Sequence, residues 1–581
     1  MTQKRFLEVI IVGSGFGGAV MCCRLATRWP GNVLLLERGK RYPKGSFARS
    51  PHDFANNLWA DAEPGQQRKL NGLFDIRNYH RMDAVVSAGL GGGSLIYANV
   101  FMPAPAWVFG QRWPAQISVD ILAPYYQIAQ GVLGARPVPP AQGDARRTIQ
   151  RTGLYADFAR ADGGTSRAAD ICVFFGKGYA NRQSGPLPIG VQERNRFGAV
   201  QTSCTYCGEC DVGCNVHAKN TLDLNYLYAA EKQHGALVET GSEVTCITPL
   251  NEAAETDSTA DGRNGYRVDY RDDAGTARHA LARRVVVSAG TLGTNELLLR
   301  CRDALGTLPR LSQRLGQGFS GNGDFLSFVT GGGRDADPNY GPVITQYIDY
   351  GLQQPQPGQP AFMLEDAAYP AFAAWYVEGL RPTASPGYLF SRIARTIKIF
   401  KQRWVDQLFS GKWSGSVVAY ANAVLQGDVS YRSSVLLFMG QDAADGTLSL
   451  KRGRLALDWP QTTSRPLYDA MVACGERFKQ FTRATSYIPQ PTWAWPVRNN
   501  ITVHPLGGCA LAEKPAQGVV SSLPGMRGQA FGYHGLYVAD GSILPTGVGA
   551  NPSATITALA EWIAEDITGL VPDDTLGVPH A

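Results

Sequence analysis

The first forty residues contain the pattern that most constrains the fold. Residues 9–12 are a short β-branched run that predicts a buried strand. The chain then passes through Gly13-Ser14-Gly15-Phe16-Gly17-Gly18, a G-x-G-x-x-G sequence. In such a turn the first glycine makes the bend, the second lets the backbone approach a pyrophosphate, and the third lets the next helix pack closely. The helix expected over residues 19–29 would present its N-terminus to the phosphates.

A second apolar strand, residues 33–36, ends on Glu37. A carboxylate at this distance from the glycine turn accepts hydrogen bonds from a ribose 2′-hydroxyl and repels a 2′-phosphate. The pattern therefore predicts an adenine dinucleotide without a 2′-phosphate, either FAD or NAD. The alternative is a glycine-rich turn with a purely structural role.

Composition narrows the class of protein. The chain has 581 residues, of which 44% are hydrophobic and 18% charged, as in a globular protein of two or three domains. The net charge of +6 is small and the basic residues are scattered, so nucleic-acid binding is not expected. No apolar run reaches the roughly 18 residues of a membrane span, and no twin arginine or cleavage site follows the first strand. We expect a cytoplasmic protein without a transmembrane segment.

A second glycine-rich segment, Gly89-Leu90-Gly91-Gly92-Gly93-Ser94, suits a backbone lying along a flat ligand and is unsuited to a helix interior. With the opening turn and the Glu-Arg-Gly at 37–39, it makes the chain resemble the glucose–methanol–choline (GMC) family of flavoproteins. The nearest branch is that of the bacterial cholesterol oxidases and their Cys-rich relatives. The resemblance implies that Gly91, Gly92 and Ser94 run beside the flavin ring. Residues 95–97 contain no histidine, so non-covalent FAD is expected.

The resemblance extends over nearly the whole chain and implies the fold class. This is α/β, with a Rossmann-like FAD-binding domain assembled from discontinuous segments and a substrate domain with a mostly antiparallel sheet and helices. Val244 is expected at the adenine end of FAD. The predicted divisions are the FAD-binding domain at 1–105, 196–320 and 499–571, a cap or substrate-side insertion at 106–195, a substrate-binding domain at 321–498 and a tail at 572–581.

His504 begins the sequence His-Pro-Leu-Gly-Gly, and Asn551 lies in Gly-Ala-Asn-Pro-Ser. A lone histidine is more often structural, but both sequences match family motifs. The match implies that His504 faces the flavin, that Asn551 is its partner, and that Asp540 and Gly541 contact FAD. Oxidation of an alcohol needs a group that takes the hydroxyl proton while hydride leaves carbon, and the pKa of histidine suits this.

Glu365 is a third catalytic candidate. It stands in the apolar stretch Phe362-Met363-Leu364-Glu365, where a half-exposed strand position is the plainer interpretation. Alignment with the cholesterol oxidases implies a base that moves a proton, so that a double bond shifts after oxidation. Burial would raise its pKa into a useful range.

One departure from the cholesterol oxidase pattern affects the substrate. That pattern has Asn at the position of Tyr97, and here Asn99 follows two residues later as the candidate cofactor contact. We therefore expect a bulky, largely apolar alcohol, sterol-like or terpenoid-like, rather than a sterol in particular. A flavin-retaining lyase is a competing function, because the family includes enzymes that cleave cyanohydrins.

Four of the eleven cysteines, Cys204, Cys207, Cys210 and Cys214, are spaced C-x2-C-x2-C-x3-C. This spacing suits an iron–sulfur cluster, [4Fe-4S] or [3Fe-4S], with Cys172 as a remote ligand if Cys214 does not bend back. Zinc and free thiols or disulfides are the alternatives. A cluster would pass electrons to an acceptor protein or quinone and make the enzyme a dehydrogenase. Its absence would fit an oxygen-using oxidase.

Residues 388–409 alternate apolar and basic positions at helical spacing. They predict a basic amphipathic helix that packs on the core. The alternative is a lid that touches a membrane surface.

Overall fold

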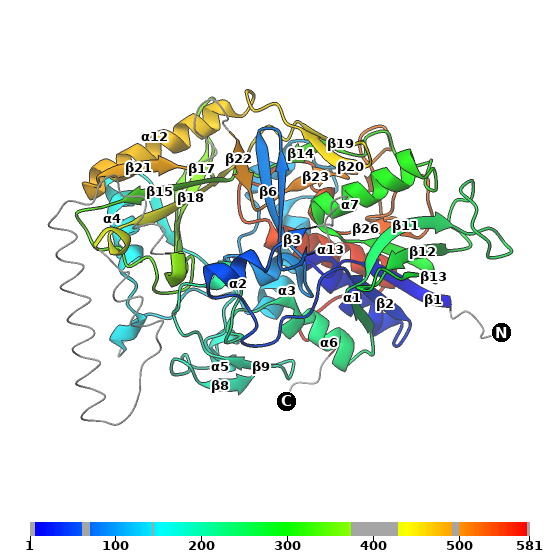
Figure 1. Ribbon diagram of the computed structural model, residues 1–581, viewed down its shortest axis with the longest axis horizontal. Helices are drawn as coiled ribbons and strands as arrows, with labels where there is room; N and C mark the ends of the chain where they lie inside the picture. The colour runs from blue at the N-terminus through cyan, green and yellow to red at the C-terminus, as the bar shows by residue number, and fades with distance from the viewer. Residues whose placement is uncertain (1–5, 61–69, 142–143, 374–427, 491–498, 578–581) are drawn as a thin grey trace.

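The computed structural model describes residues 6–60, 70–141, 144–373, 428–490 and 499–577. The amphipathic helix predicted at 388–409 lies outside the described residues. The α/β fold class is confirmed, and Figure 1 shows its two parts at opposite ends of the molecule. A largely parallel sheet with α1 and α13 forms one end, and an antiparallel sheet with α12 and α4 forms the other.

The parallel sheet is assembled from distant parts of the chain. Its strands are β1 (Phe6–Val12), β2 (Val33–Glu37), β10 (Leu237–Thr240), β13 (Ala277–Val287) and β26 (Leu536–Val538), in the spatial order β10-β2-β1-β13-β26. The first half of β13 also pairs antiparallel with β12 (Tyr266–Arg271), which pairs with β11 (Glu243–Pro249). Val9, Ile10 and Ile11 are fully buried, because helices cover both faces of such a sheet. The predicted discontinuous FAD-type domain is therefore confirmed.

Helix α1 (Phe16–Arg28) lies unusually close to its neighbours. A Cβ at Gly17 would overlap the backbone of Ala539, and one at Gly18 would overlap the carbonyl of Gly13. Helix α1 packs against α13 (Ser553–Thr568) and α6 (Tyr226–Lys232), and α3 (Val119–Leu133) packs on α13 from the other side. Glycine at 17 and 18 is what permits this approach.

The antiparallel sheet has the order β21-β15-β18-β17-β16-β7 in the described residues. Its strands are β7 (Thr165–Ala168), β15 (Phe325–Thr330), β16 (Gln346–Tyr350), β17 (Phe362–Ala367), β18 (Ser434–Gly440) and β21 (Ser486–Pro489). Helices α12 (Arg465–Thr482) and α4 (Gln150–Asp162) pack against it. Segment 106–195, predicted as one insertion, supplies α3 to the parallel side and β7 to this sheet.

Two smaller sheets connect these parts. One contains β5 (Phe74–Tyr79), β6 (Met82–Ser87) and β22 (Asn500–Thr502), and the other β14 (Gln317–Ser320), β19 (Gly446–Lys451), β20 (Arg454–Asp458) and β23 (Leu506–Gly508). Strand β6 leads into the glycine-rich segment, and β22 and β23 flank His504. The parallel pairing of β22 with β6 therefore brings the two motifs to the same place.

The remaining helices and strands are short, and α7 is the one whose N-terminus lies at Asp540. They are α2 (Pro51–Ala55), α5 (Lys177–Ala180), α7 (Gly290–Leu299), α11 (Asp428–Tyr431), β3 (Trp59–Ala60), β4 (Leu70–Asn71), β8 (Gln192–Arg194), β9 (Val200–Thr202), β24 (Leu511–Ala512) and β25 (Val520–Ser521). None of the helices in the described ranges combines the length and apolar character needed to cross a bilayer.

Candidate active site

Ser14, the second residue of the glycine turn, joins three motifs. Its Oγ lies 2.6 Å from Glu37 Oε2 and accepts the N–H of Gly91 at 3.0 Å. Its own N–H donates to Glu37 Oε2 at 3.1 Å. The nucleotide turn, the end of β2 and the glycine-rich segment are therefore held together through one serine. Sequence reasoning treated Ser14 as an unspecified position, although its place between the first two glycines could have marked it.

The glycine-rich segment lies directly on the nucleotide turn. A Cβ at Gly92 would come within 2.6 Å of the Gly15 Cα, whereas a Cβ at Gly15 would meet nothing within 4 Å. Gly91 and Gly92 adopt positive φ angles of 110° and 51°, which favour glycine. Ser94 is buried, and its hydroxyl donates to the carbonyl of Gly91. The open space at Gly15 and the bare backbone beside it fit a flat dinucleotide such as FAD.

The Glu37 carboxylate is buried and partly used by the protein itself. Oε1 accepts the N–H of Gly39 at 2.8 Å, and Oε2 accepts from Ser14. The N–H of Ser242 donates to the Glu37 carbonyl at 2.8 Å, which places the start of β11, and so Val244, beside the end of β2. This placement suits the predicted adenine contact of Val244, which stays a prediction.

Asp540 and Gly541 lie under the N-terminus of α7. The Asp540 carboxylate accepts from Thr294 Oγ1 at 2.5 Å and from the N–H and hydroxyl of Ser542 at 2.9 and 2.6 Å. Burial raises the pKa of Asp540, and these hydrogen bonds oppose the rise. Asp540 thus fixes the turn that contains Gly541, and the expected FAD contact of both residues stays a prediction.

His504 is oriented by a carboxylate that the sequence did not reveal. Its Nδ1 lies 2.9 Å from Asp324 Oδ1. The second oxygen, Oδ2, accepts the backbone N–H groups of Val503 and His504 and the hydroxyl of Thr502, all within 3.1 Å. With Nδ1 donating to this carboxylate, Nε2 keeps its lone pair and can take a proton.

The turn at residues 321–324, which precedes β15, positions both catalytic motifs. Asn322 Oδ1 accepts the N–H groups of Val548 and Gly549, both at 2.9 Å, and its Nδ2 donates to the Ala550 carbonyl at 2.8 Å. Two residues later Asp324 holds His504. Asp442 also fixes the turn, because its carboxylate accepts hydrogen bonds from Ser320 Oγ and from the N–H of Gly321. The sequence Gly-Asn-Gly-Asp before a strand was the only signal of this arrangement.

Glu365 on β17 is fully buried, which excludes the half-exposed strand position. Neither of its carboxylate oxygens, nor Oδ1 of Asn551, makes a hydrogen bond of ordinary geometry among the described residues, although the Asn551 amide lies near enough to the Glu365 carboxyl to affect its pKa. Burial raises the pKa of Glu365 well above its ordinary value, the Asn551 amide opposes the rise, and the nearby Asp366 and Asp324 charges add to it. The structure therefore brings Glu365, Asn551 and the His504–Asp324 pair together. Unpaired buried polar groups of this kind can receive a substrate hydroxyl.

Asn99 is fully buried with a positive φ of 73°, and neither atom of its amide group makes a hydrogen bond of ordinary geometry in the described part of the chain. Asn99 lies near the Cys210 thiol. Burial raises the pKa of that thiol, and Asn99 is one of the groups that oppose the rise. Its backbone carbonyl accepts the N–H of Cys172. Asn99 therefore stands between the glycine-rich segment and the cysteines, and its role as a cofactor contact stays a prediction.

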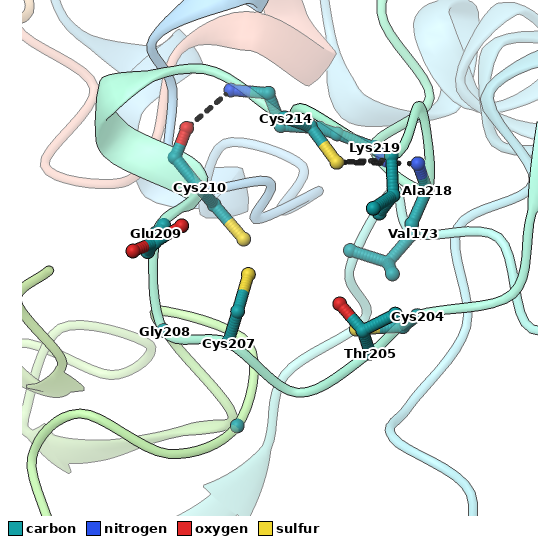
Figure 2. Close-up of a pocket in the computed structure, with 12 residues that line it drawn as sticks. Val173, Cys204, Thr205, Cys207, Gly208, Glu209, Cys210, Cys214, Ala218 and Lys219 are labelled. Carbon is teal, nitrogen blue, oxygen red and sulfur yellow. Dashed lines mark hydrogen bonds between the residues drawn. The ribbon is translucent and has the colours of Figure 1, made fainter. Parts of the chain in front are cut away.

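The four predicted cysteine ligands line one cavity. Figure 2 shows the side chains of Cys207, Cys210 and Cys214 pointing into this space. Cys207 is exposed and Cys204 is buried. Cys214 lines the cavity with the other three, whereas Cys172, considered as a remote ligand, is not part of the lining.

Within the described ranges, no group of three or more His, Cys, Asp or Glu side chains is arranged to hold a single metal ion. Thiolates that share a zinc ion must approach each other to roughly 4 Å, because each Zn–S bond is about 2.3 Å. The four thiols line one cavity, but among the described residues no three of them meet this requirement for a single ion. An iron–sulfur cluster is not shown here and stays a proposal.

The backbone of the cysteine loop turns its N–H groups toward sulfur. Tyr206 and His217 have positive φ angles of 60° and 56°, which are uncommon outside glycine. The N–H of Tyr206 donates to Cys204 Sγ at 3.4 Å, and the N–H groups of Ala218 and Lys219 donate to Cys214 Sγ at 3.2 and 3.4 Å. Such bonds stabilise a thiolate more than a thiol.

Comparison with known proteins agrees with this geometry. Family models described as GMC oxidoreductase match residues 187–317 and 445–560. A cholesterol oxidase of Acinetobacter baumannii is 29% identical, over 95% of this chain and 93% of its own. One of Mycobacterium tuberculosis (strain ATCC 25618 / H37Rv) is 28% identical, over 97% and 91%. The crystal structure of pyridoxine 4-oxidase from Mesorbium loti superposes with a TM-score of 0.54 at 15% identity, covering 96% of this chain and 98% of that one. The last similarity bears on the fold alone.

Proposed function

The chain belongs to the GMC oxidoreductase family, whose members bind FAD, and from this premise we propose that it oxidises a bulky, largely apolar alcohol to the ketone or aldehyde. The observation that supports the proposal best is the convergence of Glu365, Asn551 and the His504–Asp324 pair. FAD supplies the hydride acceptor when bound. The substrate class, sterol-like or terpenoid-like, is supported by the apolar strands of the antiparallel sheet and by the likeness to cholesterol oxidases.

The protein's own residues would handle the proton. His504 Nε2 accepts the hydroxyl proton, and Asp324 stabilises the charge that the ring gains. Asn551 holds the substrate oxygen, since its amide lies at the end of the segment fixed by Asn322. Glu365 would act as a base whose strength burial increases: its carboxylate takes a proton from the carbon between the new carbonyl and a neighbouring double bond and returns it to the far carbon of that double bond, which shifts the bond next to the carbonyl.

A panel of alcohols tested for anaerobic bleaching of the flavin absorbance checks this proposal. We expect bulky apolar secondary or primary alcohols to bleach it and sugars to leave it unchanged. His504→Ala, with FAD bound, should lose this reduction. Turnover of a cyanohydrin without any bleaching would favour a flavin-retaining lyase instead.

We further propose that the four cysteines hold an iron–sulfur cluster, which supplies one-electron transfer to an acceptor protein or quinone. Their spacing, their shared cavity and the N–H groups directed at Cys204 and Cys214 support this. Anaerobically purified protein should contain iron and acid-labile sulfide. Protein with full FAD, no iron and fast reoxidation in air would instead identify an oxygen-using oxidase with a structural cysteine loop.

A further inference from the structure

Lys219 is a fully buried lysine that connects the cysteine cavity to the glycine-rich segment. Its side chain lines the cavity. Its Nζ donates to the carbonyls of Leu95 and Tyr97 at 2.8 and 3.2 Å, and to that of Cys210 at 2.6 Å. One ammonium group therefore links the segment that follows Ser94 to a cysteine of the loop. Figure 2 shows Lys219 beside Cys210 and Cys214 at the cavity.

The contacts continue to the nucleotide turn. The Lys219 ammonium lies 5.2 Å from the ring centre of Tyr97. The Tyr97 ring in turn packs edge-on against Phe16, with ring centres 5.4 Å apart, and Phe16 is the first residue of α1. Phe16, Tyr97, Lys219 and Cys210 thus form a continuous path from the predicted dinucleotide site to the cysteine cavity.

The charge of Lys219 is not paired with a carboxylate in an ion pair within the described ranges. Among the residues that the structure describes, no carboxylate lies within ion-pair distance of its Nζ, and its three hydrogen-bond partners are neutral carbonyls. The groups whose negative charge acts on it are the thiols of Cys210 and Cys214 and, more weakly, the buried carboxyl of Asp211. A buried ammonium in this position is costly unless negative charge stands nearby. The adjoining space is the cavity of the four cysteines. Four thiolates bring four negative charges, which the positive core of an iron–sulfur cluster cancels only in part.

We propose that Lys219 is the positioning residue and counter-charge of this metal site: it attracts an anionic cluster into the cavity and fixes the cavity against segment 95–97. This inference rests on the proposed cluster. A fixed positive charge stabilises the more negative, reduced form of a cluster, so Lys219 should raise the reduction potential of the cluster. It should also keep the cysteine loop close enough to the flavin site for electrons to pass.

Lys219→Gln removes the charge and keeps N–H donors for the carbonyls, whereas Lys219→Arg keeps the charge. Lys44→Met is a matched control, because Lys44 binds Thr202 near the same loop and does not line the cavity. For each variant we would measure FAD, iron and sulfide per chain, and the midpoint potential by titration monitored with electron paramagnetic resonance. We expect a lower potential or loss of iron with FAD retained in Lys219→Gln, and values near wild type in Lys219→Arg and Lys44→Met.

Unchanged iron content and potential in Lys219→Gln would overturn the role of Lys219 and leave the cluster standing. Wild-type protein that lacks iron, or holds zinc in its place, would overturn the cluster itself and this inference with it. If Lys219→Gln does not retain FAD, Lys219→Arg decides the question: loss of iron from that variant with FAD still bound would contradict a role based on charge.

Discussion

Buried carboxylates near the site differ according to their hydrogen bonds. Asp324 and Asp442 accept from several backbone N–H and hydroxyl groups, and each fixes a segment of chain. Glu365 accepts no hydrogen bond from the described residues and has its pKa raised by burial. Similar groups thus take a positioning role or a proton-exchanging role according to their surroundings.

Asp324→Asn should slow reduction of the flavin by alcohol. Two backbone N–H groups point at Oδ2, so the asparagine oxygen will occupy that position and its NH2 will face His504 Nδ1. The ring proton then moves to Nε2, which can no longer accept the substrate proton. We expect a decrease of about 10²- to 10⁴-fold, the upper value being that known for the same change in a serine protease. Anaerobic stopped-flow measures the rate, and nitrogen NMR of His504 reports the tautomer.

The control for this change is Asp335→Asn, which alters an exposed carboxylate paired with Arg432. It should leave the reduction rate unchanged. A wild-type rate in Asp324→Asn would show that the tautomer of His504 is immaterial to the reaction.

Glu365→Gln should stabilise the protein at high pH. The pKa of Glu365 is raised in the folded protein, so the folded state keeps a proton that the unfolded chain releases above about pH 4.3. Stability from this group is complete below that pH and is lost as pH rises toward the folded-state pKa. The neutral glutamine does not titrate, so its melting temperature should match wild type near pH 4 and exceed it at pH 8. Glu476→Gln on the exposed face of α12 should show no such divergence.

At the scale of single elements, the glycines at the start of α1 have separable tasks. A Cβ at Gly15 enters open space, whereas a Cβ at Gly17 overlaps the Ala539 backbone. Gly15→Ala should therefore leave the melting temperature of the apoprotein nearly unchanged and weaken FAD binding. Gly17→Ala should destabilise the apoprotein by about 1–3 kcal/mol or more, because α1 must move away from its neighbours. Calorimetry of the apoprotein and flavin titration measure the two effects. Equal losses in both variants would contradict this division.

The elements also show what sequence reasoning could reach. The glycine turn, Glu37 and the antiparallel sheet were predictable, because each depends on short-range patterns in residue type. Ser14, Asn322, Asp324 and Asp442 were not singled out, since their roles arise from contacts with segments 23 to 228 residues away. The resemblance supplied His504 and Asn551 but not the turn that holds them. The burial of Glu365 was one of two alternatives that the sequence left open, and its role as a base stays a prediction.

At the scale of the whole molecule, the cysteine cavity and the proposed alcohol site are built from different residues, so the two half-reactions should be separable. Cys210→Ser should leave anaerobic reduction of the flavin by alcohol within about two-fold of wild type, because Cys210 makes none of the proposed interactions that strengthen in the transition state of that step. Turnover with an artificial one-electron acceptor should fall strongly. Cys246→Ser, outside the cavity, is the control. Loss of both half-reactions in Cys210→Ser would indicate that the cysteine loop shapes the flavin site itself.

The turn at residues 321–324 determines where this chain can be joined to part of a related protein in a chimaera. It belongs by position to the antiparallel sheet, yet Asn322 and Asp324 are bound by segments that follow the sheet in the chain. A chimaera that takes its antiparallel sheet from a related protein, starting at Gly321, would also replace the turn that holds the catalytic motifs of this chain. A junction placed just after Asp324 would keep the turn together with the motifs that it positions. Only the strands of the antiparallel sheet would then be exchanged. Exchange of the antiparallel sheet to change substrate specificity should therefore tolerate a junction after Asp324 but not one before Gly321.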